Sequence, residues 1–457
     1  MPVPKQRAFF ENVHFWLLTA FLILAFLTGG GSRPDVQSLV ILRPIAVLVI
    51  GFALAGMTWD QLRRWKPLAF LLGSCLLICV VHLIPLPPSV WQLLPGRDIV
   101  TQLDKASGLG PVWRPLSLAP WGTLNAFYAL AVPMAVFLLL IRMSPAQRHR
   151  ILVVVIGMGL LSGLIGVLQA VGDPSGPLYF YRVTNNGGAV GLFANRNHQA
   201  AFLATLFPML AVFAMTGVET REKAQFKAVL AVSAAVVVVP LLLVTGSRAG
   251  LILGLVGVCG AALIYRRPHI STPEKRRVQR INPAYVLGGI GLLMLIAITI
   301  LSSRAVAIQR LISQSDEDTR LHIWAPAWDM VGKYFPVGSG IGSFVEVFQV
   351  DEPDALLQTS YVNHAHNDFL EVLLTGGLPG LVLLAAAAIL ILREGLAIIG
   401  RAAGSGKSRV YSKLGFLIVA MLSAASVADY PIRTPSLSAL FVIALVWLFG
   451  ARDQPAQ

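Results

Sequence analysis

The sequence predicts an all-α polytopic integral membrane protein with about 12 transmembrane helices. Of its 457 residues, 56% are hydrophobic and only 13% are charged, and the mean hydropathy is +0.72. Such a chain is far too apolar for an ordinary soluble protein. Apolar runs near the roughly 20 residues that cross a bilayer recur along the whole chain, between short polar loops. The predicted spans are 15–31, 38–57, 67–86, 122–142, 151–171, 199–216, 228–245, 250–266, 284–302, 372–392, 413–428 and 437–451.

The first apolar run, FWLLTAFLILAFLTGGG, is expected to remain in the protein as a membrane anchor. It has no small-residue cleavage pattern of the kind that ends a signal peptide, and further spans follow it.

The net charge of +14 could suggest nucleic-acid binding, but the distribution of the basic residues indicates membrane orientation instead. With the N-terminus inside, roughly two thirds of the 36 lysines and arginines fall on inner segments, as the positive-inside rule requires. The most basic inner loop contains YRRPHISTPEKRRVQR. Both termini are therefore expected in the cytoplasm, and the basic loops are expected to contact membrane lipids rather than nucleic acid.

The outer face carries the longer loops, at 87–121, 172–198 and 303–371, so the chemistry is expected there. The first is rich in proline and tryptophan, a composition suited to the membrane interface and to shaping an entrance. The third lies between the ninth and tenth spans and is the longest segment outside the predicted spans.

The third loop is expected to contain a helix. Ser315 and Asp318 have the spacing of a capping pair. In TRLHIWAPAWDMV an apolar stripe follows, made of Leu321, Trp324, Trp328 and Val331. This helical periodicity predicts a helix that lies flat on the outer leaflet or roofs a cavity. The glycine-rich PVGSGIGSF after it has no P-loop lysine and is interpreted as a turn.

Four polar clusters lie at or near the outer ends of the spans, where charged groups are costly and tend to be kept for pairing or function. Arg248 stands in a very short polar break between two spans, so it is held at the membrane surface. Guanidinium groups bind phosphate through paired donors, so Arg248 and Arg320 suit a lipid-linked diphosphate, with plain lipid-headgroup contact as the alternative. The clusters are Asn195-Arg196-Asn197-His198, Ser247-Arg248, Arg320 and His364-Ala365-His366-Asn367-Asp368.

His366 is the candidate general base, because an imidazole near the interface can accept a proton from a hydroxyl nucleophile. Asn367 or Asp368 can cap the helix that follows it. A metal site formed by His364, His366 and Asp368 is the weaker alternative, since alternating residues point apart on a helix. For His364 and His198 a structural role remains open. Three cysteines, all within predicted spans, indicate no disulfide or zinc framework.

Four segments resemble, in order and topology, the O-antigen ligase and polymerase superfamily. They are GLFANRNHQAAFLA, LLVTGSRAG, TRLHIWAPAWDMV with FPVGSGIGSF, and HNDFLEVLLTGGLPGL. The resemblance covers roughly 190–385. Its strongest part is His366-Asn367, then nine residues, then Gly377, which is similar to the histidine signature of the ligases. It implies N-terminal transmembrane helices over 1–190, a ligase-like core over 191–385 that includes loop 303–371, and C-terminal transmembrane helices over 386–457.

The resemblance implies a bacterial inner-membrane glycosyltransferase of the GT-C type with its active site on the periplasmic side. Such enzymes pass a glycan from undecaprenyl diphosphate to an acceptor hydroxyl, with inversion and without metal or another cofactor. By resemblance, Arg248 and Arg320 hold the diphosphate and His366 is the base or orients the acceptor. The residues expected to contact substrate are Arg196, Asn197, His198, His364 and Asn367.

The acceptor stays open between three kinds of hydroxyl. A ligase uses lipid A-core, a polymerase uses another lipid-linked repeat, and related enzymes use protein; the histidine signature favours a ligase. Arg196 stands where a proline is often found in the family, so it is either an extra donor for the diphosphate or a contact to the sugar.

A secondary transporter or lipid flippase is the alternative class, because such proteins also have about twelve spans. They are expected to have two similar halves and polar groups at mid-membrane. The sequence has its polar groups concentrated on one face instead, apart from Arg43 within a span, so an enzyme is favoured.

Overall fold

The computed structural model describes residues 4–268, 315–357, 361–400 and 406–450. It is 73% helix and 1% strand, which agrees with the predicted all-α class. The helices that form the bundle are α1 (Pro4–Thr28), α2 (Leu39–Leu54), α4 (Lys66–Leu83), α7 (Pro120–Ala129), α8 (Ala131–Arg142), α9 (Pro145–Val171), α10 (Arg196–Met215), α11 (Arg221–Val244), α12 (Arg248–Ile264), α16 (Asp368–Gly400), α17 (Lys407–Ala425) and α18 (Pro435–Phe449).

Short elements cap the two ends of this bundle. At one end lies α3 (Trp59–Arg64). At the other end, β1 (Pro85–Leu86) and β2 (Arg114–Pro115) form an antiparallel pair in which Pro85 is opposite Pro115. The remaining elements of that end are α5 (Pro88–Trp91), α6 (Asp98–Ala106), α14 (Ser315–Tyr334), α15 (Phe344–Asp351), η1 (Asp354–Leu356) and η2 (Pro431–Arg433).

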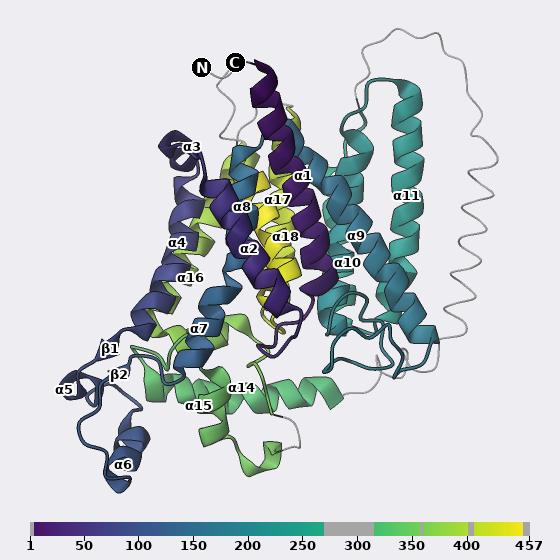
Figure 1. Ribbon diagram of the computed structural model, residues 1–457. Helices are drawn as coiled ribbons and strands as arrows, with labels where there is room; N and C mark the ends of the chain where they lie inside the picture. Colours follow the sequence, from purple (N-terminus) through teal and green to yellow (C-terminus); the bar gives the residue numbers. More distant parts are fainter. Residues whose placement is uncertain (1–3, 269–314, 358–360, 401–405, 451–457) are drawn as a thin grey trace.

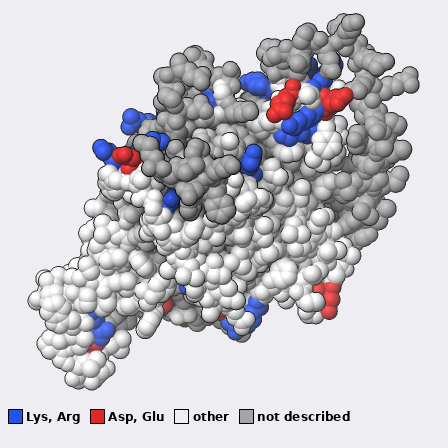
Figure 2. Space-filling view, turned by 45° about the horizontal axis from the view of Figure 1, so that its top comes forward, with Lys and Arg blue, Asp and Glu red and all other residues white. Residues whose placement is uncertain are grey.

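Figure 1 shows the bundle helices running side by side, with the start of α1 and the end of α18 at the same end. The α14 helix lies across the opposite end, close to α15 and to the short β1 and β2 strands. Figure 2 shows a broad band without charged residues between charged side chains at the two ends. This distribution is that of a protein whose middle lies in hydrocarbon.

Among the described residues, seven helices are long and apolar enough to cross a membrane, judged by length and composition. Four shorter apolar helices, Asn12–Thr28, Leu39–Leu54, Arg248–Ile264 and Pro435–Phe449, coincide with four further predicted spans. The predicted span at 284–302 lies outside the described residues. A polytopic membrane protein is therefore supported, and the count of twelve spans stays a prediction.

The α10 helix occupies the centre of the bundle. In its apolar window 83% of the residues are buried inside the protein, against 17% for α16. Small residues bring α12 against it: a Cβ atom on Gly250 would lie 2.3 Å from the Cβ of Ala200, and one on Gly257 would lie 2.5 Å from the carbonyl oxygen of Ala204. This close packing places the start of α12, and thus Arg248, beside the first turn of α10.

The α14 helix lies at the predicted position, and one of its faces is buried in the protein. Ile323, Ala327, Met330 and Tyr334 are at most 3% exposed, at a spacing of four, three and four residues. Of the predicted stripe, Val331 is buried, whereas Trp328 is 62% exposed and lines a groove together with Trp324. The side chains of Ser315, Asp318 and Leu321 lie outside the described residues.

The α16 helix is broken at Gly377, whose φ of 56° and ψ of −146° are not helical. The turn before α15 takes over the hydrogen bonds that the break releases. Leu378 N donates to Pro336 O at 2.7 Å, Ser339 N donates to Leu374 O at 3.1 Å, and Gly340 N donates to Thr375 O at 2.8 Å. Non-helical backbone within a membrane span is tolerated where protein satisfies its polar groups in this way.

The first outer loop is fixed to the same turn by a buried arginine. Arg97 is 0% exposed, and its Nη2 donates to Leu116 O at 2.7 Å and to Gly338 O at 3.1 Å. The loop 87–121 and the turn that supports the α16 break therefore form one structural unit.

Candidate active site

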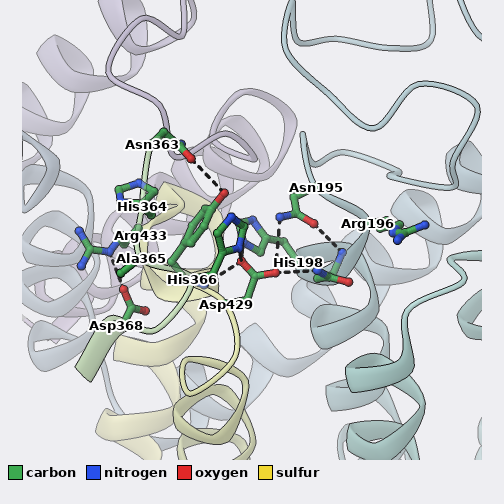
Figure 3. A network of polar contacts seen from close by, with 12 residues as sticks. Asn195, Arg196, His198, Asn363, His364, Ala365, His366, Asp368, Asp429 and Arg433 are labelled. Carbon is green, nitrogen blue, oxygen red and sulfur yellow. Dashed lines mark hydrogen bonds and ion pairs between the residues drawn. The ribbon is translucent and has the colours of Figure 1, made fainter. Parts of the chain in front are cut away.

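Two buried polar networks meet where α10, α16 and α18 begin (Figure 3). Three segments distant in sequence supply their residues: the cap and first turn of α10 (195–198), the histidine loop (361–367) with the first turn of α16, and the final connection (426–434) between α17 and α18.

Asp429 in the final connection is the centre of the first network. Its carboxylate is 6% exposed. Its Oδ2 accepts hydrogen bonds from the Nδ2 atoms of Asn197, at 2.7 Å, and Asn195, at 3.5 Å, while Oδ1 accepts one from Tyr430 N at 2.9 Å. Asn195 also caps α10, because its Oδ1 accepts from Asn197 N at 2.8 Å. The predicted asparagine cluster thus serves to hold a buried acid.

Two histidines face the same oxygen of Asp429. His198 Nε2 lies 3.4 Å from Oδ1, and His366 Nδ1 lies 3.6 Å from it. Burial acts to raise the pKa of Asp429, but the interactions with the two facing histidines outweigh burial and hold it well below its usual range. Asp429 is therefore a carboxylate at neutral pH.

Tyr430 fills the space between the imidazoles. It is 7% exposed, and burial together with the nearby carboxylates of Asp429 and Glu371 raises the pKa of its hydroxyl. It is therefore neutral and provides an uncharged wall rather than a base. Its ring centroid lies 5.1 Å from that of His198, 4.3 Å from that of His364 and 4.9 Å from that of His366.

Glu371 in the first turn of α16 is the centre of the second network. It is 2% exposed and accepts hydrogen bonds from Ala365 N at 2.9 Å and from His364 Nδ1 at 3.1 Å. Arg433 Nη1 lies 2.8 Å from its Oε1, and the same guanidinium pairs with Asp368. Burial alone would lower the pKa of Arg433, but the two carboxylates outweigh burial and raise it.

This second network fixes the histidine loop to the start of α16 and weakens the metal alternative. His364 and Asp368 belong to the Glu371 and Arg433 pairs, whereas His366 faces Asp429, so the three side chains have different partners. Within the described residues, no group of three His, Cys, Asp or Glu could hold a metal ion.

His366 has a left-handed backbone, with φ of 50°, and is the only residue other than glycine with positive φ in the described part of the chain. Its side chain is 26% exposed, in contrast to the buried His198. With Nδ1 facing Asp429, Nε2 is the nitrogen left for a substrate. Such conformations cluster at active sites.

Asn367 caps α16, as predicted. Its Oδ1 accepts hydrogen bonds from Phe369 N and Leu370 N, both at 3.1 Å. It also lies at the outer end of a groove of about 920 Å³ between α14 and α16. The groove is apolar apart from Asp329 and Asn367, and its lining includes Trp324, Trp328, Leu370, Leu373, Leu381 and Ala388.

The predicted arginines are less closely gathered. Arg248 begins α12 and is half-buried; Ser247 caps that helix by accepting from Gly250 N at 3.0 Å. Arg196 begins α10, and its side chain points away from Asp429 (Figure 3). Arg320 belongs to α14, but its side chain lies outside the described residues. The structure thus brings together Asn197, His198, His364, His366 and Asn367, with Arg248 on the neighbouring helix.

Sequence reasoning missed the acids and the tyrosine of the site. Asp429, Tyr430 and Arg433 stand in VADYPIRTP, a short polar break between two apolar runs. Like the break around Arg248, it is a short polar segment between two apolar runs. The signal that could have revealed these residues was a charged pair flanking an aromatic residue at the end of a span. Glu371 had a weaker signal, as an acid in the first turn of an apolar helix.

A comparison with protein families matches residues 233–385 to the model described as O-antigen ligase. The matched segment contains Arg248, Arg320, His366 and the α16 break, whereas His198 and Asp429 lie outside it. A search of the curated proteins found no match.

Proposed function

We propose that this chain, whose residues 233–385 match the O-antigen ligase family, is a bacterial inner-membrane glycosyltransferase of the O-antigen ligase and polymerase superfamily. The donor would be an undecaprenyl-diphosphate-linked glycan, and the acceptor a hydroxyl at the periplasmic face, with lipid A-core favoured. The observation that carries the proposal is the pairing of the partly exposed His366 with the buried carboxylate of Asp429. His366 lies in a loop of the matched segment.

His366 is the proposed general base. Asp429 faces Nδ1, so a proton on Nδ1 is stabilised and Nε2 is free to accept the proton of the acceptor hydroxyl. As that proton leaves, the acceptor oxygen forms a bond to the anomeric carbon. The bond from this carbon to the diphosphate breaks on the opposite side, and its electron pair leaves with undecaprenyl diphosphate. The product is an inverted glycosidic linkage.

Arg248 and Arg320 are the proposed binding groups for the diphosphate, with Arg196 as a further candidate. The leaving diphosphate gains one negative charge, and guanidinium groups aimed at that charge lower the barrier. The position of Arg248 beside the first turn of α10 supports this role, because Asn197 in that turn holds Asp429. No metal or cofactor is part of the proposed mechanism.

The groove between α14 and α16 suits the isoprenoid chain of the donor. It begins at Asn367, next to the proposed base, and its apolar lining reaches Ala388, well within the α16 span. A chain lying there would bring its diphosphate to the outer end of α16. Burial of apolar surface in such a groove contributes roughly 25 cal/mol per Å².

An in-vitro transfer assay tests the proposal. Purified protein would receive undecaprenyl-diphosphate glycan with either lipid A-core or a second donor molecule as acceptor, in the presence of a chelator. Transfer to lipid A-core would identify a ligase, and chain growth without it would identify a polymerase. His366→Ala and Arg248→Ala are expected to lose at least about 100-fold in rate.

Two exposed residues provide matched controls. His322→Ala on α14 and Arg182→Ala in the connection before α10 remove the same side-chain types at exposed positions, and both are expected to retain wild-type rates. If neither product forms while the lipid-linked substrate binds or crosses the bilayer, the enzyme proposal fails and the transporter alternative takes its place.

A further inference from the structure

His198 is a buried histidine at the start of α10. It is the third residue of α10 and is 1% exposed. The edge of its ring is turned to Tyr430, at an interplanar angle of 80°. A buried imidazole loses its hydration, so its retention at such a position calls for a partner.

The partner of His198 is the carboxylate oxygen that also faces the proposed base. Its Nε2 is 3.4 Å from Asp429 Oδ1, and Nδ1 of His366 is 3.6 Å from the same atom. The other oxygen, Oδ2, is occupied by Asn197 and Asn195. The two imidazoles therefore share one negative charge in a buried site.

The sharing has a direct electrostatic consequence. A proton on His198 Nε2 faces Oδ1 and takes up part of the negative charge that would otherwise stabilise a protonated His366. Two imidazolium rings around a single buried carboxylate would leave an uncompensated positive charge, which is unfavourable in a low dielectric. A donor at His198 therefore weakens the stabilisation that Asp429 gives to a proton on His366.

We propose that His198 is a positioning residue for the transfer reaction, which acts through Asp429 to limit how strongly that carboxylate stabilises a proton on His366. This inference rests on the proposed function for its meaning in catalysis. The pairing of the two rings can be tested without it.

Other titratable groups surround the pair and are the same in every variant below. Among the described residues, Asp429 and Tyr430 contact both rings. Further groups near them are His364 in the histidine loop, Asp368 and Glu371 on α16, Arg433 in η2, and Arg196 and Arg248 at the starts of α10 and α12.

The test is the pH dependence of transfer in His198→Leu and His198→Gln. Without a donor at position 198, Asp429 interacts more strongly with His366, and protonated His366 becomes more stable. The acidic limb of the rate profile in His198→Leu should therefore move to higher pH, by about one unit. Glutamine can place an amide donor near Oδ1. The pH profile and the transfer rate of His198→Gln should therefore be close to those of the wild type.

Gln199→Leu is the matched control. Gln199 is the next residue of α10, is also 1% exposed, and loses a buried hydrogen bond to Ser162 Oγ at 2.6 Å without contacting Asp429. Its effect on the rate should be the same at every pH. A purely structural role for His198 would give His198→Leu this same flat profile and would overturn the proposal.

A second readout does not depend on activity. Diethyl pyrocarbonate acylates neutral imidazole, so the labelling rate of His366, followed by site-resolved mass spectrometry against pH, reports its protonation. The pH midpoint of His366 labelling should be higher in His198→Leu than in the wild type, and close to the wild-type value in His198→Gln. Equal midpoints in wild type and His198→Leu would overturn the pairing. A shifted midpoint without any transfer by the wild type would retain the pairing and reject the proposed function.

Discussion

The left-handed backbone of His366 is stabilised from both sides. A residue other than glycine in this region carries a conformational cost of about 1 kcal/mol or more. The preceding Ala365 N donates to Glu371, and the following Asn367 caps α16. These contacts fix the backbone, so the direction of the imidazole is set before any substrate binds, which favours catalysis by a positioned base.

Asp429→Asn is expected to lower kcat about 100-fold with little change in KM, because the amide keeps the size of the side chain but removes the charge that stabilises protonated His366. In-vitro transfer at several acceptor concentrations measures this. Asp173→Asn, which changes an exposed acid in the connection before α10, is the control and should have no effect. Wild-type kcat in Asp429→Asn would remove Asp429 from the mechanism.

Asp429 should also make stability depend on pH. Its pKa is lowered in the folded protein, so its carboxylate stabilises the fold above the ordinary carboxyl pKa of about 4, and this contribution is lost as pH falls below that value. Thermal unfolding of wild type and Asp429→Asn in detergent should therefore differ most near neutral pH. The difference in melting temperature between the two proteins should become smaller towards pH 3. A difference that is the same at every pH would contradict the ion-pair network.

At the scale of elements, the histidine signature from His366 to Gly377 corresponds to a short helical segment with a residue of positive φ at each end. His366 has φ of 50° and Gly377 has φ of 56°. The residues between them form the cap and the first segment of α16, about 14 Å of helix. The fixed spacing therefore sets the distance from the proposed base to the helix break, where the turn before α15 is bound.

Gly377→Ala is expected to lower the free energy of unfolding by at least about 2 kcal/mol. The new Cβ would lie 2.3 Å from Pro336 O and 2.6 Å from Gly338 N, in a backbone region that alanine rarely adopts. Gly332→Ala on α14, where a Cβ meets nothing within 4 Å, should be neutral or slightly stabilising. Melting temperatures in detergent compare the two; equal values would contradict the tight contact at the break.

The sequence allowed prediction of those elements whose cause is local. The apolar runs within the described residues became helices, Asn367 capped α16, and the loop after the ninth predicted span contained α14. The buried face of α14 and the break in α16 depend on which segment packs against them, and periodicity alone contains no such information. Tryptophans in particular satisfy a helical stripe equally well when they line a groove.

For the molecule as a whole, the site depends on contacts that no single stretch of sequence reveals. Asn197 and His198 are more than 200 positions from Asp429, yet they share its carboxylate. The predicted histidines and asparagines were chosen by chemistry and position at a span end, and five of them do lie together. Their common acid could not be identified without the packing of α10 against the final connection.

The orientation of the bundle can be tested with a membrane-impermeant maleimide on intact cells. Ser175→Cys lies in the connection before α10, at the end that holds the candidate site, and Glu219→Cys lies in the connection after α10, at the other end. After replacement of the three native cysteines by alanine, Ser175→Cys should be labelled and Glu219→Cys should not. The reverse pattern would place the site in the cytoplasm and exclude the proposed function.

The final connection has a consequence for biosynthesis. Asp429, Tyr430 and Arg433 lie between the last two helices of the described chain, so they are among the last residues of the site to leave the ribosome. Until α17 and α18 insert as a hairpin, Glu371 has no arginine and the two histidines have no counter-ion. Under the proposed function, a nascent chain therefore cannot catalyse transfer before α17 and α18 have inserted, because His366 then lacks Asp429.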